Sequence, residues 1–518
     1  MTVGRRGRSS MRLAVWACVL AVPVTASEDE VTVAFGAEPV QVDPTRTSAG
    51  VDEYFLDLFY DQLLRLDRDL VRANWLAKKW EVRERQGTTS IWIEIHEGVK
   101  FHNGEELTAD DLRYSYTRQS DRTLSRQAGR WNNVADVVVV DDHTLEIVFS
   151  KPDSILLPLD FEMYAVPRRY FEEVGEDGIQ KHPIGTGPWK FVSRRPRDEL
   201  VVERFDGYWR PAELPGVERL TIKIIPEDTT RVAAFKTGAV DLIDAVPPAQ
   251  VEEFRSMPGV KTTSVPSGNN LFLSMNAIDP GSPLRNETVR RAVAHAYDMD
   301  AIVEYILFKQ GIRTVELAPG SFGYDPTLRA YPYDPEKSRR LLAEAGYPRG
   351  INVNCYNLTT PRVPYMKQVG EAIYAYLTEA GVRCRIVQLE YGAWINLGRR
   401  DARPEMDGIG HWMWGQGLPG DPTDAWSGHL HSTGDAWGPY SYHADSELDA
   451  VVEELRATMD LGEKEALIRR IARVKHDRVA GGLPTYRPLL TMAWRDSLDF
   501  LPEPLAGWHS MRGLGRTE

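Results

Sequence analysis

The chain has 518 residues, of which 42% are hydrophobic, 26% charged and 10% aromatic. Because one hydrophobic core serves at most about 250–300 residues, two or three lobes are expected, and the composition excludes collagen-like, disordered and multi-spanning membrane proteins. The 62 basic and 75 acidic residues give a net charge of −13, which argues against a nucleic-acid-binding protein, and three cysteines exclude a disulfide-rich scaffold or a multi-cysteine metal cage.

The N-terminal segment has the pattern of a cleaved signal peptide. Four arginines and no acidic residue precede an apolar run at residues 13–22, which is too short to span a bilayer. Small residues then offer a cleavage site, and either Met1 or Met11 can serve as the start. Trp16 stands where a lipoprotein signal needs a small residue, so lipid attachment at Cys18 is disfavoured. We expect an exported, periplasmic protein without a lipid anchor.

The first half of the mature chain is expected to be rich in strands. Residues 31–35 and 90–95 read as strands, and 137–140 and 144–149 read as a hairpin. Thr108 is an N-cap residue with an acid three positions later, which predicts a helix start. Further strands are expected at 189–192, 200–204 and 220–225.

After Pro266 the pattern changes to alternating strands and helices. Residues 271–276 predict a strand, and 289–297 and 301–308 predict helices. Asp334 followed by proline at the first helical position predicts another helix start. A helical stretch then covers residues 446–479. Strand-rich, alternating and helical segments in this order predict an α/β protein of at least two lobes.

Cys355 and Cys384 lie in two strands of one predicted βαβ unit. In 351–357 and in 382–386, apolar and polar residues alternate, and each cysteine falls on the apolar side. The strands of such a unit commonly lie side by side, and an export compartment permits a disulfide. Two outcomes stay open. Two buried thiols are favoured over a disulfide, because the sequence does not fix the strand register.

Motifs for catalysis are absent from the sequence. There is no G-x-x-x-x-G-K-[ST] phosphate loop and no G-x-S-x-G elbow. His96-Glu97 and His102 resemble a zinc-protease motif, but the histidines are six positions apart instead of four. Asp110 and Asp111 open a predicted helix, where acids are favoured structurally. We therefore expect no catalytic residues, no metal and no cofactor.

Residues 411–440 combine tryptophan with glycine and proline. Trp412, Trp414, Trp426 and Trp437 fall within these thirty residues. Tryptophan on irregular backbone suits a ligand pocket, because a rigid ring supplies contact area and its N–H supplies orientation. The alternative is a core patch beneath a long loop.

Four segments together resemble one protein family. EGVKFHNGEELTADDLRYSYTR (97–118) and HPIGTGPWKF (182–191) are similar to its signature stretches, and residues 203–243 and 321–350 follow its pattern. The family is that of the extracytoplasmic solute-binding proteins of peptide- and nickel-type ABC importers, also called the dipeptide/oligopeptide-binding family. The resemblance covers about residues 30–490.

The resemblance implies a periplasmic-binding-protein-like α/β fold. Such a fold has two lobes, an extra domain inserted in the N-terminal lobe, and a ligand cleft between the lobes. Two crossing segments are expected near 264–272 and 482–490. The implied division is a signal peptide at 1–26, a core of lobe 1 from 27–60, 184–266 and 486–518, an extra domain at 61–183, and lobe 2 at 267–485.

The resemblance also implies the function. The protein would be the substrate-binding subunit of an ABC importer, which captures a peptide or peptide-like solute by lobe closure and delivers it to permease subunits in the membrane. It would act as a monomer, without cofactor or nucleic acid. An oligosaccharide, an opine or a nickel complex is the alternative ligand. A secreted glycosidase-like hydrolase is the alternative of another class, and it would need two carboxylates about 5 to 10 Å apart.

One departure from the family pattern concerns the ligand's amino terminus. Peptide-binding members commonly hold it with an aspartate just upstream of an Asp-Pro pair. Asp421-Pro422 matches the pair, but residues 414–420 contain no aspartate, and a buried ammonium without a counter-charge is costly. The residues that the resemblance proposes for ligand binding are Asp43, Ser274, Asn276, Trp412, Trp414, Gln416 and Asp421.

Overall fold

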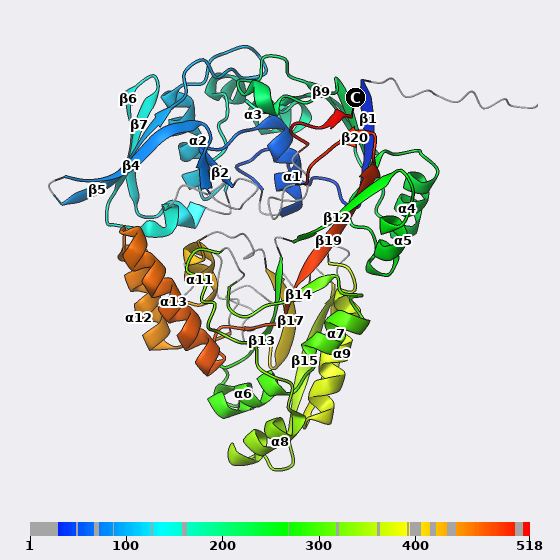
Figure 1. The fold of residues 1–518 in the computed structure, drawn as a ribbon. Helices are drawn as coiled ribbons and strands as arrows, with labels where there is room; N and C mark the ends of the chain where they lie inside the picture. The colour runs from blue at the N-terminus through cyan, green and yellow to red at the C-terminus, as the bar shows by residue number, and fades with distance from the viewer. Residues whose placement is uncertain are drawn as a thin grey trace, which may run out of the picture.

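The computed structural model describes residues 29–517 with the exception of several segments. These are residues 48–49, 67–71, 86, 126–127, 158–162, 268, 318–320, 360–362, 391–392, 394–405, 415–420, 433–441 and 503–510. The predicted signal peptide, Gln416 and Trp437 therefore lie outside the described residues. Figure 1 shows a broad upper part, here lobe 1 (sheets from residues 30–266 and 486–516), above a tapering lower part, here lobe 2 (sheet from residues 270–484).

A mixed sheet forms the centre of lobe 1. β1 (Glu30–Phe35) runs parallel to both of its neighbours, β10 and β11, and four of its six residues are buried, as expected for a central strand. The predicted strands at 31–35, 189–192, 200–204 and 220–225 are confirmed. In spatial order the strands are β12 (Val260–Pro266), β19 (Tyr486–Arg495), β11 (Leu242–Ile243), β1 (Glu30–Phe35), β10 (Arg219–Ile224), β9 (Glu199–Arg204) and β8 (Trp189–Arg195). The helices α1 (Gly50–Phe59), α3 (Arg168–Lys181), α4 (Asp228–Lys236) and α5 (Val251–Arg255) belong to the same lobe.

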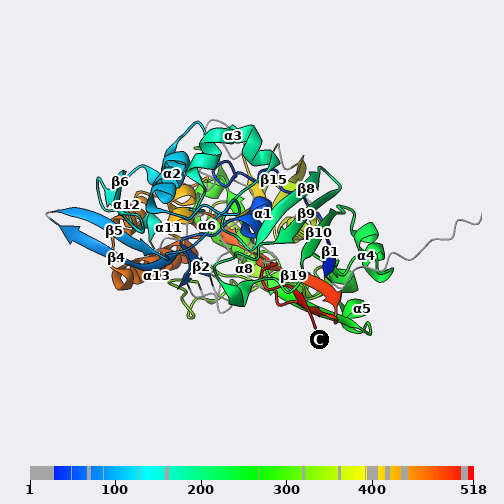
Figure 2. The same cartoon turned by 90° about the horizontal axis from the view of Figure 1, so that it is seen from above.

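A second, four-stranded sheet lies at the opposite end of lobe 1 from β8–β10 (Figure 2). Its hairpin β6–β7 confirms the predicted one, with Thr144 opposite Asp141 across the turn. Thr108 begins the helix α2 as predicted, because its main-chain N–H is held by the carboxylate of Asp111 at 2.9 Å. The elements are β4 (Ala77–Arg85), β5 (Thr88–Ile95), β7 (Thr144–Phe149), β6 (Val134–Asp141) and α2 (Ala109–Ser120).

A buried carboxylate joins the parts of lobe 1. Asp61 is fully buried and accepts hydrogen bonds from the indole N–H groups of Trp75 (2.8 Å) and Trp209 (3.1 Å). It also accepts from the hydroxyl of Thr186 at 2.9 Å and pairs with Arg512 at 2.9 Å. Since these partners come from four distant stretches of sequence, one charge holds the beginning, the middle and the end of the chain together.

Lobe 2 is a sheet covered by helices. β15 lies between β16 and β17 and runs parallel to both, as the predicted βαβ unit requires. The predicted helices are present with slightly shifted ends. The strands in order are β16 (Val382–Glu390), β15 (Ile351–Thr359), β17 (Ile409–Trp414), β13 (Asn270–Met275) and β18 (Leu483–Pro484). The helices are α6 (Glu287–His295), α7 (Met299–Tyr305), α8 (Pro335–Glu344), α9 (Met366–Glu379), α11 (Thr423–His429), α12 (Ser446–Ala457) and α13 (Leu461–Arg478).

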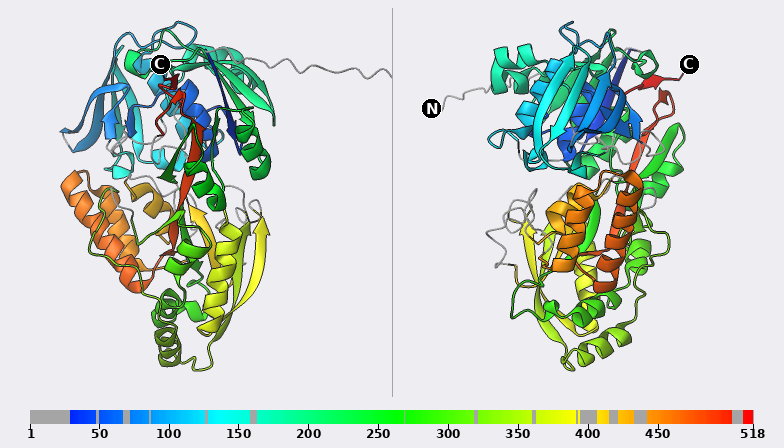
Figure 3. Two further views of the ribbon diagram at one scale, coloured as in Figure 1. Left: turned by 45° about the vertical axis from the view of Figure 1, so that its right-hand side comes forward. Right: turned by 90° about the vertical axis from the view of Figure 1, so that its left-hand side faces the viewer.

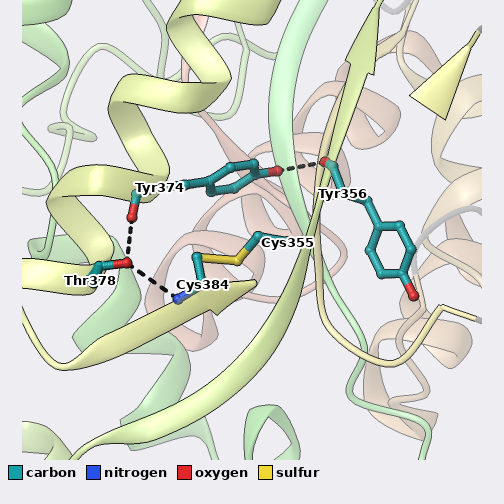
Figure 4. Close-up of a disulfide and its surroundings, with 5 residues drawn as sticks. All are labelled: Cys355, Tyr356, Tyr374, Thr378 and Cys384. Atoms are coloured by element: carbon teal, nitrogen blue, oxygen red, sulfur yellow. Dashed lines mark hydrogen bonds between the residues drawn. A yellow bond between two sulfur atoms is a disulfide. The ribbon is translucent and has the colours of Figure 1, made fainter. Parts of the chain in front are cut away.

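Cys355 and Cys384 form a disulfide, so the expectation of two thiols is wrong. The parallel register sets Val353 opposite Cys384, which brings the two cysteine Cα atoms to 5.4 Å. Figure 4 shows how α9 holds the pair: the hydroxyl of Thr378 accepts a hydrogen bond from the main-chain N–H of Cys384 at 3.2 Å. Tyr374 of the same helix donates to the carbonyl of Tyr356 at 2.6 Å. The cross-link ties the edge strand β16 to the centre of its sheet.

Among the described residues, the chain passes between the lobes twice, between β12 and β13 and between β18 and β19. The two crossings bond to each other: Ser267 N–H donates to Pro488 at 2.9 Å, and Thr485 N–H donates to Leu271 at 2.8 Å. A short strand of lobe 2, β14 (Gly311–Arg313), extends the sheet of lobe 1 by pairing with β19. Both crossings fall inside their predicted ranges. The finer domain boundaries remain a prediction.

The disulfide gives the first testable prediction. Replacing both cysteines by serine (Cys355→Ser with Cys384→Ser) is expected to lower the free energy of unfolding by about 3 kcal/mol, because the open loop regains conformational freedom in the unfolded chain. Urea unfolding of the variant and of wild type with and without reductant measures the difference. Reduced wild type should match the variant. An unchanged midpoint with two titratable thiols in unreduced protein would show that the pair does not form.

Candidate ligand-binding site

Three of the proposed ligand-binding residues lie on two adjacent strands of lobe 2, and a fourth follows one of them. β13 and β17 pair so that Ser274 lies opposite Gly410, while Asn270 lies opposite Trp414. Trp412 lies between them in the same register, and Asn276 follows directly after β13. The antiparallel pairing therefore brings together residues that are about 140 positions apart in the sequence.

The described tryptophan rings of the 411–440 segment pack in the interior. Trp412 is 3% exposed, and its ring lies 6.5 Å from that of Tyr356 within the core of lobe 2. It covers Gly410, where any side chain would collide with the ring. Trp426, 1% exposed, packs in a separate cluster with residues of α12 and α13. These two rings thus agree with the alternative interpretation, a core patch, and not with a ligand pocket. The side chain of Trp414 lies outside the described part of the structure.

Ser274 and Asn276 are both buried. Asn276 is engaged with the main chain: its amide donates to the carbonyl of Met406, and its oxygen accepts from the N–H groups of Ile278 and Asp279 at 3.0 Å each. The side chain thus fixes the turn that follows β13. Its contact with a ligand stays a prediction.

Asp43 lies in lobe 1, in the loop after β1. Its carboxylate accepts from Arg118 of α2 at 2.5 Å and from the N–H of Thr45 at 3.0 Å. Burial raises the pKa of this carboxyl, and the guanidinium of Arg118 opposes the shift. The pair ties the loop to α2 of lobe 1, whereas the β13–β17 residues belong to lobe 2.

Asp421 lies at the start of α11, where its carboxylate accepts from the main-chain N–H of Thr423 at 2.9 Å. Its second oxygen pairs with Lys464 of α13, and both side chains are almost fully buried. The ammonium of Lys464 also donates to the carbonyls of Ser154 (2.7 Å) and Leu157 (2.8 Å) in lobe 1. Asp421 therefore orients a cation that spans the two lobes.

Further contacts join the lobes at this edge. Arg456 of α12 pairs with the buried carboxylate of Asp153 at 2.5 Å, and the hydroxyl of Ser154 donates to the carbonyl of Leu455 at 2.8 Å. Figure 3 shows α12 and α13, in orange, below the four-stranded part of lobe 1. The lobes thus touch at two edges: at the crossings and at this set of residues (153–157 with 421, 455, 456 and 464), here called the distal contact.

Sequence reasoning missed a polar group at the crossings. Thr485, Tyr486 and Arg487 are all buried, and the Thr485 hydroxyl, the Tyr486 hydroxyl and the Arg487 Nε have no hydrogen-bond partner among the described residues. His411 stacks 6.4 Å from Tyr486 and is fully buried, which lowers its pKa to about 3. The available signal was an arginine inside an otherwise apolar strand, YRPLLTMAW.

Other kinds of site find little support. Among the described residues, no group of three histidine, cysteine, aspartate or glutamate side chains is placed to hold a metal ion. Within the same residues, no helix combines the length and the apolar character that crossing a membrane requires. Two lobes linked by paired crossings, with polar residues where they meet, define a class: proteins that enclose a ligand between domains.

The family comparison agrees with this class. The model of the "Bacterial extracellular solute-binding proteins, family 5 Middle" matches residues 73–437. The chain belongs to this family, which confirms the resemblance seen in the sequence. It is an extracytoplasmic solute-binding protein.

Individual relatives extend over most of the chain. The glutathione-binding protein GsiB of Pectobacterium atrosepticum is 27% identical over 486 residues, 90% of each chain. The dipeptide-binding protein of Escherichia coli is 25% identical over 463 residues, 84% of each. The structure of DppA from Helicobacter pylori, in complex with the peptide STSA, has a TM-score of 0.79 at 21% identity and covers 94% of this chain and 98% of that one.

The buried pair Lys464–Asp421 gives a second prediction. Lys464→Met should lower the free energy of unfolding by about 3–5 kcal/mol, because it leaves the Asp421 carboxylate buried without its cation. Lys464→Met combined with Asp421→Asn should recover part of the loss, as a double-mutant cycle in urea would show. Arg469→Met, which breaks an exposed pair on the same helix, is the control and should cost less than about 1 kcal/mol. Equal stability of Lys464→Met and wild type would contradict the pairing.

Buried His411 gives a prediction on pH. Its folded pKa of about 3 lies below the ordinary 6.5, so only the unfolded chain takes up a proton as the pH falls below 6.5. Stability from this residue is complete above pH 6.5 and declines by about 1.4 kcal/mol per pH unit towards pH 3. His411→Leu should flatten the dependence of unfolding free energy on pH by about that slope between pH 6 and 4. Parallel curves for His411→Leu and wild type would contradict the assignment.

Proposed function

We propose that the protein is the substrate-binding subunit of an ABC importer for a peptide or peptide-like solute. The observation that carries this proposal is the match, over 84–90% of each chain, to relatives named for glutathione and for dipeptides. Membership of an extracellular solute-binding family supports an exported protein, and the N-terminal pattern of arginines and an apolar run supports a cleaved signal peptide.

The two-edge contact between the lobes supports a closing mechanism. At the crossings, the paired main chains allow bending with few groups to rearrange, whereas the distal contact consists of side-chain bonds that can break and re-form. A solute that touches both lobes shifts the population towards the closed arrangement. Permease subunits then receive the solute from the closed protein, which acts as a monomer. No bond in the solute is made or broken in this cycle.

The proposed ligand position is the β13–β17 region of lobe 2 facing lobe 1. Ser274, Trp412 and Trp414 lie on this strand pair. We propose that Asp43 and Asp421 support the site from the two lobes through their cations, Arg118 and Lys464. Asn276 holds the turn beside it. Gln416 lies outside the described residues, and its contact with a ligand stays a prediction.

Binding without turnover tests the function. Purified protein is screened by thermal shift and calorimetry against reduced glutathione, Met-Leu, di- and tripeptide mixtures and matched oligosaccharides, and native mass spectrometry identifies any co-purified solute. At least one peptide should raise the unfolding temperature and bind at about micromolar Kd or better. Mass spectrometry should recover that peptide unchanged. Binding of saccharides alone would overturn the peptide proposal, and cleavage of a bound peptide would overturn the transport role.

A further inference from the structure

Arg487 differs in its hydrogen-bond partners from four other buried arginines, Arg118, Arg231, Arg290 and Arg512. Arg118, Arg231 and Arg512 pair with the carboxylates of aspartates. Arg290 lacks such a pair, but it donates to main-chain carbonyls at 2.9–3.3 Å. Arg487 is 4% exposed, its Nε has no hydrogen-bond partner among the described residues, and burial is the one influence that shifts its pKa.

Such a group is costly to keep in the folded protein. Removing a cation from water without a counter-charge disfavours its charged form, and burial alone lowers the pKa of Arg487 to about 10. At neutral pH the guanidinium still carries its charge. Because this buried charge has no counter-charge among the described residues, it strongly attracts an anion.

The position of Arg487 is the place where the lobes meet. It lies on β19 opposite Ile312, one residue before Pro488, whose carbonyl receives the crossing bond from Ser267. Thr485, two residues earlier and just before β19, also has a buried hydroxyl without a partner among the described residues. A cation and a hydroxyl donor thus lie two residues apart in the segment where the chain passes between the lobes.

We propose that Arg487 binds a carboxylate group of the transported solute. The planar guanidinium offers parallel N–H donors that match the two oxygens of a carboxylate, and the hydroxyl of Thr485 can add a third bond. The inference deepens the proposed function, because it rests on a ligand held between the lobes and specifies the charge of the part that reaches the crossings. The solute must therefore carry an anionic group at one end, and the rest of the solute can vary.

The test compares matched probes on two proteins. Wild type and Arg487→Met are titrated with Met-Leu, Met-Leu amide, N-acetyl-Met-Leu and reduced glutathione, and then with acetate, succinate and citrate. We expect wild type to bind at least one free carboxylate about 100-fold more tightly than its amide, and Arg487→Met to lose that difference. Arg495→Met, on the same strand but with its guanidinium on the ring and the carbonyl of Phe235, should bind like wild type.

A second readout separates binding from folding. Ligand-free Arg487→Met should unfold at the same temperature as wild type or higher, because an unpaired buried charge has been removed. A variant that unfolds earlier while its affinity for carboxylates is unchanged would assign Arg487 a structural role and overturn the inference. If the variant does not fold, the acid-to-amide comparison on wild type still decides.

The outcomes also separate this inference from the proposed function. Equal binding of peptide acids and amides would overturn the role of Arg487 and leave peptide transport intact. Binding of succinate or citrate alone, abolished in Arg487→Met, would support the carboxylate site and overturn the peptide proposal. Failure of every carboxylate to bind wild type would overturn the inference.

Discussion

The pairing of the two crossing segments is the constraint on which the rest of the molecule depends. Ser267 bonds to Pro488 and Thr485 bonds to Leu271, so the chain passes between the lobes as one narrow, two-stranded ribbon. Because both passages lie together, the lobes can change their angle while the sheets on each side stay intact. The same ribbon carries Thr485 and Arg487 to the junction. Hinge and recognition are therefore built from one short stretch of sequence.

Buried cations have protein partners at one edge of the lobe interface and lack them at the other. At the distal contact every cation has protein partners: Lys464 has Asp421 and two carbonyls, and Arg456 has Asp153. At the crossings, Arg487 has none within the described residues. The first edge supplies closing contacts that depend only on the protein, and the second favours closure around an anion. Substitutions at the distal contact should therefore change lobe closure, and substitutions at the crossings should change ligand affinity.

Local sequence signals predicted local structure well. The capping of α2 by Thr108, the hairpin β6–β7 and the start of α8 at Asp334 each depend on a few neighbouring residues. Helix α3 was not predicted, since Gly175 and Gly178 lower helix propensity. The disulfide depended on strand register, and the partners of Asp43 and Asp421 lie 75 and 43 positions away, so no local pattern reveals them. The unpaired state of Arg487 depends on everything that surrounds it.

The role of Arg512 has a consequence for the order in which the chain can fold. Lobe 2 is a continuous stretch whose sheet is complete once residue 484 has been made, so it can fold while the C-terminus is still being synthesised. The central sheet of lobe 1, by contrast, needs β19, and the buried Asp61 needs Arg512. Until those residues arrive, Asp61 lacks its cation and the central sheet lacks a strand. The central sheet of lobe 1 is thus complete only when the two ends of the described chain are in contact.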